Sequence, residues 1–371
     1  MAKKALVIGG GIVGCCAAHL LGRKGFACTV VEKAPLLGGG VKTYRYGGHP
    51  FTYGPRHFLT RNEKTFAYLE SVIPMRRIPE HEFLTYVERD GQFYHYPIHE
   101  DDIPLMPDAA QVQEELAGRK EIRKPANLEE YWMQAVGSTL YSKFIENYSK
   151  KMWRVGSNQE IDEFNWSPKG VALASGPKAC WGSAISAFPE SPNGYDEYFG
   201  IATQGADVHV GTLIEDYDLE RKSVKIGGVW HAFDLVISTI SPEVTLKNAF
   251  GPLKWIGRKF LQIVLPMEDC FPPNVYFLYY ANEEPFTRIV EYKRFYKYSS
   301  PTTLLGLEIP VSSEEGGKLY PLPILSEQAK AQKYLDAMPA GVFSIGRHGS
   351  YQYKLDIAPS FEQLFGVMEK I

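Results

Sequence analysis

The chain has 371 residues, more than one hydrophobic core usually serves, so two or three structural units are expected. A hydrophobic fraction of 44% and a charged fraction of 22% describe an ordinary globular composition. The formal net charge of -3 argues against a nucleic-acid or membrane partner. Its five cysteines form no Cys-x-x-Cys pair, and no apolar stretch free of glycine is long enough to span a membrane. A cytoplasmic protein is therefore expected.

The N-terminal segment has the pattern of a dinucleotide site. Residues 5–8 predict a buried parallel strand, and Gly9, Gly11 and Gly14 follow in a G-x-G-x-x-G arrangement. A helical pattern and a second apolar run come next, and that run ends at Glu32. In such a unit the three glycines permit a tight turn, approach to a pyrophosphate and close helix packing, and the acid accepts hydrogen bonds from ribose hydroxyls. The order predicts a Rossmann-type unit.

The next segment favours FAD over NAD. Lys33 follows the acid, and a second glycine cluster that includes Gly38 and Gly39 comes a few residues later. Glycines at this distance resemble the second glycine element of FAD-dependent oxidoreductases related to amine oxidases, where the chain runs close along the cofactor. FAD is therefore the expected cofactor, and a flexible loop is the alternative interpretation. No metal is expected.

The rest of the sequence predicts a helical region, a lid and further strands. Residues 109–155 carry a helical pattern, and residues 166–195 have the composition of a loop or lid. Two runs around Asp90-Gly91, at 83–87 and 92–96, predict a hairpin. The other expected elements are strands at 43–46, 51–53, 208–210, 235–237, 260–265, 275–280, 288–292 and 341–345 and a closing helix at 361–370. Of these strands, 208–210 and 235–237 are expected to return to the Rossmann sheet.

Several separated segments resemble one family. They are YGPRHFLT at 53–60, NLEE at 127–130, YSKKMW at 148–153, PFTRIVEYKRF at 285–295, EIP at 308–310, YP at 320–321, and Gly346-Arg347 followed by Tyr351 and Tyr353. Together with the two glycine elements, their order and spacing resemble the prokaryotic UDP-galactopyranose mutases nearly end to end.

The resemblance implies an α/β fold in three parts and a homodimer. The parts are a Rossmann-type FAD-binding domain (1–60, 196–250 and 330–371), a small helical bundle with a mobile loop (100–185) and an antiparallel β-sheet domain (61–99 and 251–329). It also implies an isomerase that acts on a nucleoside-diphosphate sugar. In this chemistry reduced flavin N5 attacks the anomeric carbon, the adduct opens through an iminium, and the sugar recloses through another hydroxyl.

The resemblance also assigns site residues. Arg288 and Arg347 would face the diphosphate, for which the guanidinium fork is suited. Arg347 and Asp356 would also contact the flavin. The other substrate residues implied are Tyr320 and Tyr353 at the phosphates, Phe144 and Tyr148 at the base, Trp153 beside sugar and flavin, and Asn274.

Some positions depart from the family pattern. The family has histidines where this chain has Arg56 and Leu59, and His57 lies between them. Arg56 and His57 are therefore candidate catalytic residues beside Arg288, Arg347 and Trp153. No arginine occurs between residues 154 and 221, where the family's mobile loop carries one, so Lys178 is the expected substitute. These differences leave the sugar and the base open.

Two other functions compete with the mutase. A redox FAD enzyme of the amine-oxidase-like or desaturase-like kind would share the glycine motifs but would not need both Arg288 and Arg347. Turnover without net electron consumption distinguishes the mutase from it. A non-catalytic sugar-nucleotide binder would bind flavin and a nucleoside diphosphate and isomerise no sugar.

Overall fold

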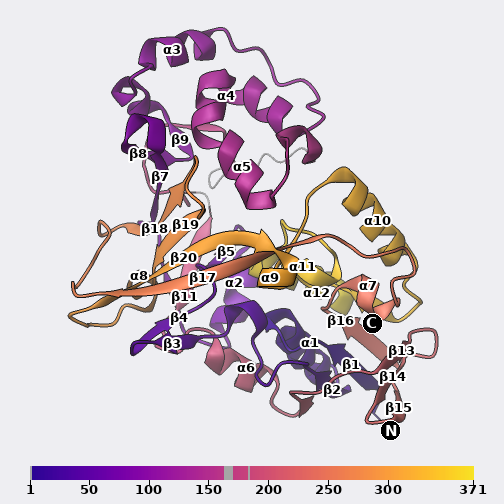
Figure 1. The fold of residues 1–371 in the computed structure, drawn as a ribbon. Coiled ribbons are helices and arrows are strands. Elements are labelled where there is room, and N and C mark those ends of the chain that lie inside the picture. The colour runs from indigo at the N-terminus through magenta and orange to yellow at the C-terminus, as the bar shows by residue number, and fades with distance from the viewer. Residues whose placement is uncertain (1, 163–169, 183) are drawn as a thin grey trace.

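A five-stranded parallel sheet lies at the bottom of Figure 1, in the order β12-β2-β1-β16-β22. The computed structural model describes residues 2–162, 170–182 and 184–371. The strands are β1 (Lys4–Ile8), β2 (Ala27–Val31), β12 (Asp207–His209), β16 (Leu235–Ser238) and β22 (Val342–Ser344). The returning strands predicted from the sequence are thus confirmed, and three distant parts of the chain build one sheet.

Apolar strands and helices explain why this sheet forms. All four residues of β16 and four of the five in β1 are buried, as expected of parallel strands covered on both faces. Helix α1 (Ile12–Arg23) packs against β1, β2 and the closing helix α12 (Ile357–Met368). The sheet therefore holds the start of α1 at the carboxyl end of β1, where the glycines lie.

A seven-stranded sheet forms the second layer, in the order β21-β17-β20-β19-β18-β7-β8. Its strands are β7 (Glu82–Val87), β8 (Gln92–Tyr96), β17 (Trp255–Leu265), β18 (Val275–Tyr280), β19 (Arg288–Glu291), β20 (Thr303–Ser312) and β21 (Tyr320–Pro321). The hairpin predicted around Asp90-Gly91 is confirmed as β7 and β8. The neighbouring strands of this sheet pair antiparallel, as expected, except β7 and β18, which pair in parallel. No short turn joins these two strands, so nothing forces them to run in opposite directions.

Three helices form the part of the molecule at the top of Figure 1: α3 (Ala109–Ala117), α4 (Leu128–Phe144) and α5 (Glu146–Trp153). The predicted helical region is thus interrupted between α3 and α4. Asn127 caps α4 by accepting a hydrogen bond from the Glu130 amide. Gly137 (φ 85°, ψ 171°) breaks α4, and Glu115 accepts hydrogen bonds from the Thr139 amide and hydroxyl just after the break. The second half of α4 therefore has its own direction.

The segment predicted to be a loop or lid contains a strand. Residues 166–169 and 183 of that segment lie outside the described residues, but β11 (Ile185–Pro189) pairs with β5 (Phe58–Thr60) and with β6 (Met75–Arg77). The strand was missed because only Ile185 in it is β-branched, and burial between two partners supplies what local propensity does not.

The remaining elements are shorter or lie outside the site. They are β3 (Tyr44–Tyr46), β4 (His49–Phe51), α2 (Glu63–Glu70), β9 (Ile98–His99), β10 (Leu173–Ala174), α6 (Asp196–Ala202), β13 (Asp216–Asp218), β14 (Ser223–Ile226), β15 (Val229–Ala232), α7 (Pro242–Thr245), α8 (Tyr292–Tyr296), α9 (Ser313–Gly316), α10 (Leu325–Asp336) and α11 (Gly346–Gly349). Among the described helices, none has the length and apolar composition needed to cross a membrane.

Candidate functional site

The glycine turn between β1 and α1 has the geometry of a dinucleotide loop. Gly9 has a φ of 97°, which favours glycine, and a Cβ at Gly14 would lie 1.9 Å from the Gly9 carbonyl oxygen. Gly11 differs from both. Its φ is -68°, and a Cβ placed there would meet no protein atom within 4 Å. Gly9 and Gly14 are thus required by the fold, whereas Gly11 borders open space.

The second glycine element lies directly against the first. The Gly38 amide donates to the Gly10 carbonyl at 2.8 Å, and Gly38 forms an isolated bridge with Gly11. The Glu32 carboxylate accepts hydrogen bonds from the Gly10 amide (2.6 Å) and the Ala34 amide (2.7 Å). Lys33 and Gly39 are exposed beside them. Main-chain groups around open space and a nearby carboxylate fit the pyrophosphate and the ribose of a dinucleotide.

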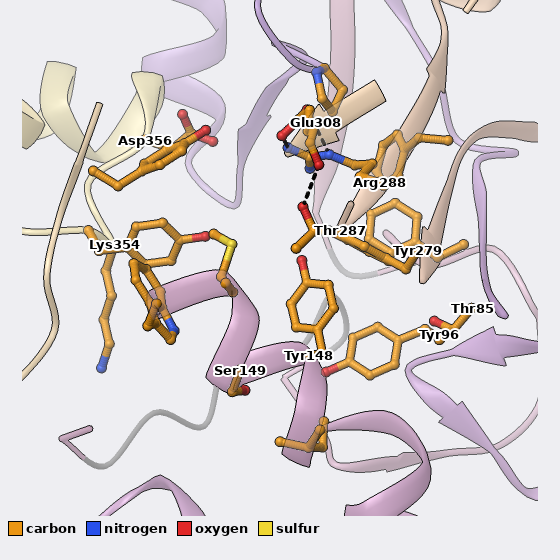
Figure 2. A pocket seen from close by; sticks show the side chains of 18 of the residues that line it. Thr85, Tyr96, Tyr148, Ser149, Tyr279, Thr287, Arg288, Glu308, Lys354 and Asp356 are labelled. Carbon is orange, nitrogen blue, oxygen red and sulfur yellow. Dashed lines mark hydrogen bonds and ion pairs between the residues drawn. The ribbon is translucent and has the colours of Figure 1, made fainter. Parts of the chain in front are cut away.

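A cavity of about 280 Å³ lies between the large sheet, helices α4 and α5, and the C-terminal segment that contains Arg347 and Asp356 (Figure 2). Its lining is mostly aromatic, with a few charged groups, as is usual in sites for organic ligands. Helices α4 and α5 contribute one wall, and β7, β8, β18, β19 and β20 contribute the opposite part. The lining includes these sequence-predicted residues: Arg56, His57, Phe144, Tyr148, Trp153, Arg288, Tyr320, Arg347, Tyr353 and Asp356.

Arg288 and Glu308 form the strongest ion pair of the cavity. Arg288 Nε and Nη2 donate to the two carboxylate oxygens of Glu308 at 2.9 and 2.7 Å, across the paired strands β19 and β20. Burial alone would lower the pKa of Arg288, but Glu308 outweighs burial and holds that pKa well above its ordinary value. The guanidinium is therefore permanently charged and fixed in position at the cavity, where a cation can bind an anion.

Arg347 lies at another side of the same cavity. It pairs with Asp356 at 3.2 Å, and its guanidinium lies 5.4 Å from the centre of the Tyr320 ring and 5.7 Å from that of Tyr353. The Trp153 and Tyr353 rings meet edge to face at 4.6 Å. A cation supported by aromatic rings and a carboxylate is thus held close to the wall formed by α5.

Tyrosines form an aromatic wall beside the Arg288–Glu308 pair. Tyr148 contacts Tyr279 edge to face at 5.4 Å, and burial raises its pKa well above the usual value, so its hydroxyl stays protonated. In Figure 2 this hydroxyl points toward Thr287 and the Arg288–Glu308 pair. Phe144 also lines the cavity and is only 3% exposed. The wall therefore has flat aromatic faces on which a ligand ring can pack, and the Tyr148 hydroxyl points toward Arg288.

The departures from the family pattern lie together at the cavity. Arg56 Nη2 donates to the Tyr320 hydroxyl at 3.3 Å. His57 stacks on Phe295 at 6.0 Å and lies 5.3 Å from Trp181. Among the described residues neither ring nitrogen of His57 has a hydrogen-bond partner, and burial lowers the pKa of His57 to about 4. The imidazole is therefore neutral at physiological pH, and its two buried nitrogens are left without a partner among the described residues.

Two predicted substrate residues lie away from the cavity. Lys178 pairs with Asp102 at 3.5 Å, and Asn274 is exposed and donates to Glu82 at 3.4 Å. Neither lines the cavity, so the structure does not bring them to the predicted site. Lys178 was expected to replace the arginine of the family's mobile loop, but this segment matches the family pattern only when gaps are allowed. The Asn274 side chain is directed by the turn before β18, which the sequence pattern does not specify.

Other cavity residues had no role in the sequence analysis. Glu308 lies in a segment that carried the family resemblance, but its partnership with Arg288 requires the register of β19 and β20. Thr85 and Tyr96 come from the hairpin and Tyr279 from β18, strands that were recognised without a direction for their side chains. No signal in a single sequence identifies which face of these strands meets α5.

The fold and the cavity define a dinucleotide-binding protein of the Rossmann class with a second site for an anionic, ring-containing ligand. A family model of UDP-galactopyranose mutase matches residues 143–353, and a model of an NAD(P)-binding Rossmann-like domain matches residues 7–72. The chain belongs to the UDP-galactopyranose mutase family, which confirms the resemblance found in the sequence. The family and the Rossmann-like domain together imply a flavin cofactor.

Individual relatives are distant but cover the whole chain. The dTDP-fucopyranose mutase of Escherichia coli is 23% identical over 95% of this chain and 94% of its own length. A probable UDP-galactopyranose mutase of Klebsiella pneumoniae is 23% identical over 95% of this chain and 90% of its own. The crystal structure of reduced UDP-galactopyranose mutase has a TM-score of 0.82 at 17% identity, covering 100% of this chain and 93% of that one. A putative protoporphyrinogen oxidase from Exiguobacterium sp. 255-15 has a TM-score of 0.72 at 15% identity, with both chains fully covered. These structural likenesses show the fold, and the relatives named mutases support an isomerase that acts on a nucleotide sugar.

Proposed function

We propose that the protein is a flavin-dependent mutase that interconverts the pyranose and furanose forms of a nucleoside-diphosphate sugar. The observation that carries this proposal is the cavity itself. Two fixed arginines, Arg288 and Arg347, line the cavity together with aromatic rings, and Arg56 links the cavity to Gly40 of the second glycine cluster. A ligand with a base, a diphosphate and a sugar has complementary groups in that order.

The chain's own residues would bind and orient the substrate. FAD, when bound in its reduced form, supplies the nucleophilic nitrogen that displaces the diphosphate. Arg288 and Arg347 would hold the diphosphate while it is bonded to the sugar and while it is free, so that it returns to the same carbon. The rings of Tyr148 and Trp153 would exclude water, which would otherwise hydrolyse the sugar.

The direct test uses reduced protein and a panel of substrates. Protein reduced with dithionite under anaerobic conditions is incubated with UDP-, dTDP- and GDP-hexopyranoses, and furanose products are separated by chromatography. One or more furanose products are expected, with no net consumption of reductant. Protein kept oxidised in air is the control and should be inactive. Absence of product from every sugar would exclude the mutase, and equal turnover in air would exclude the reduced-flavin chemistry.

The same experiment addresses the competing functions. Consumption of one reducing equivalent per turnover would identify a redox enzyme. A flavin-containing protein that binds UDP or dTDP and isomerises none of the sugars would be a non-catalytic binder, which the replacement of two family histidines by Arg56 and Leu59 favours as the second candidate. The homodimer and the cytoplasmic location stay predictions.

A further inference from the structure

Arg56 lies at the junction between the cavity and the glycine elements. Its Nη2 group donates to the Tyr320 hydroxyl at 3.3 Å, and a Cβ placed at Gly40 would lie 3.9 Å from the same nitrogen. Arg288 contacts the Tyr279 ring, which packs on Tyr148, and it also lies close to Gly54, two residues before Arg56. The cavity therefore runs from the aromatic wall, past Arg288, to Arg56 beside the second glycine element.

Among the described residues, Arg56 lacks the direct ion pair that the other two arginines along this path have. Arg288 is paired with Glu308, and Arg347 is paired with Asp356. Within residues 2–162, 170–182 and 184–371, no carboxylate lies at ion-pair distance from Arg56, and its buried Nε has no hydrogen-bond partner. Burial alone would lower the pKa of Arg56, but Tyr320 and the more distant carboxylates of Asp356 and Glu308 outweigh burial and the repulsion from Arg288, so this pKa is raised. A charged guanidinium without a direct ion-pair partner keeps N–H groups that can donate to an anionic ligand.

Arg56 also sets the hydrogen-bonding role of the Tyr320 hydroxyl. Three guanidinium groups surround the Tyr320 ring, those of Arg258, Arg347 and Arg56, at 4.9, 5.4 and 5.9 Å from its centre. Burial alone would raise the pKa of Tyr320, but Arg56 leads the opposing charges and the pKa is lowered. Because the hydroxyl oxygen accepts from Arg56, its own proton is available to donate into the cavity. A polarised hydroxyl of this kind is a strong donor to a phosphate oxygen.

We propose that Arg56 and Tyr320 form a fixed binding unit for the distal phosphate, the one bonded to the sugar. The inference rests on the proposed function and assigns to Arg56 the charge that Lys178, held by Asp102, does not bring to the cavity. A nucleoside whose ring packs on the Tyr148 wall places its first phosphate near Arg288 and its second near Arg56. Arg56 then adds a third cation beside Arg288 and Arg347, and this cation needs no movement of a loop.

The test compares UDP with UMP, which lacks the distal phosphate. Binding to the oxidised flavoprotein is measured by calorimetry for the wild type and for Arg56→Gln. We expect UDP affinity to fall by about ten- to a hundredfold in Arg56→Gln and UMP affinity to stay within about twofold, because only UDP has the group that Arg56 binds. Arg56→Lys should recover part of the UDP affinity, since it keeps the charge and loses the fork. The control is Arg221→Gln. Arg221 is exposed and does not line the cavity, so this variant should bind both ligands as the wild type does.

Each other outcome would overturn the inference. Equal losses for UDP and UMP would place Arg56 at the first phosphate or in a general structural role. Unchanged UDP affinity with a lowered flavin reduction potential, measured by dye equilibration, would mean that Arg56 serves the reduced flavin instead. Flavin content and melting temperature of each variant exclude misfolding. Wild-type protein that binds neither UDP nor dTDP would refute the proposed function itself, whereas wild-type binding with an unaffected Arg56→Gln would refute this inference alone.

Discussion

The glycine turn and the cavity are built in opposite ways. In the turn, main-chain groups form the site. Gly9, Gly11 and Gly14 contribute to it because they have no side chains. In the cavity, charged and aromatic side chains from at least eight helices and strands make the site, and the main chain only positions them. A main-chain site tolerates no added atom, whereas a side-chain site can change its ligand by exchanging single residues. The departures from the family pattern at Arg56 and Leu59 lie in the second kind of site.

The largest expected effect is on stability and flavin binding in the glycine turn, where Gly14 and Gly11 have different roles. Gly14→Val would place its Cβ 1.9 Å from the Gly9 oxygen, and we expect the apoprotein to lose about 3 kcal/mol or more of stability. The Cβ of Gly11→Val would meet no protein atom within 4 Å, and φ at this position is ordinary, so the apoprotein should melt like the wild type. Its flavin content should nevertheless fall sharply, because the new side chain occupies the space for the pyrophosphate. Thermal melts of apoprotein and flavin absorbance check both, and full flavin content in Gly11→Val would contradict the cofactor assignment.

The next effect separates stability from binding in the cavity. Arg288→Ala leaves Glu308 buried without a partner, and we expect a loss of about 3–5 kcal/mol together with UDP affinity reduced at least tenfold. The double variant Arg288→Met, Glu308→Gln removes both charges and should recover most of the stability but none of the affinity. Melting temperature and calorimetric titration with UDP measure the two properties. Wild-type UDP affinity in a double variant that keeps its flavin would remove Arg288 from the substrate site.

A smaller effect concerns the neutral histidine of the cavity. The pKa of His57 is lowered to about 4 in the folded protein, against about 6.5 when unfolded, so protonation favours the unfolded chain. Its contribution to stability is present above pH 6.5 and is lost as the pH falls toward 4. Between pH 7 and pH 5 the wild type should lose about 2 kcal/mol more than His57→Phe. Denaturation at both pH values measures this difference. His231→Phe, at an exposed position, should keep the wild-type dependence, and identical slopes for His57→Phe and wild type would refute the prediction.

The smallest effect is expected at Lys178. Its partner in the structure is Asp102, outside the cavity, and partly exposed ion pairs of this kind contribute less than about 1 kcal/mol. Lys178→Ala should therefore change UDP affinity and turnover by less than about twofold. A tenfold loss of affinity in the same titration would show that this segment moves and brings the lysine to the substrate, as the sequence analysis expected.

Sequence and structure agree where the signal is local. Three features depend on residues only a few positions apart, and the sequence predicts them: the turn, its two flanking strands and the hairpin at Asp90-Gly91. The ion pair of Arg288 with Glu308 could not be predicted from the sequence, because it depends on the register of two strands. The strand at 185–189 was missed because its partners, rather than its composition, stabilise it. Lys178 and Asn274 failed to reach the cavity for the same reason: segments without regular structure give no direction to a side chain.

The order of strands in the parallel sheet also sets when the protein can fold. Strand β1 lies between β2, which follows it directly, and β16, which begins at residue 235. At roughly 5–20 residues per second, a ribosome needs roughly 10–40 s after β2 to deliver β16, and still longer to deliver β22. During that time one edge of β1 has no partner from its own sheet, and the turn that follows β1 lacks its support. Cofactor loading must therefore follow synthesis, and chaperones that shield the nascent N-terminal strands should increase the yield of flavin-containing protein more than added flavin does.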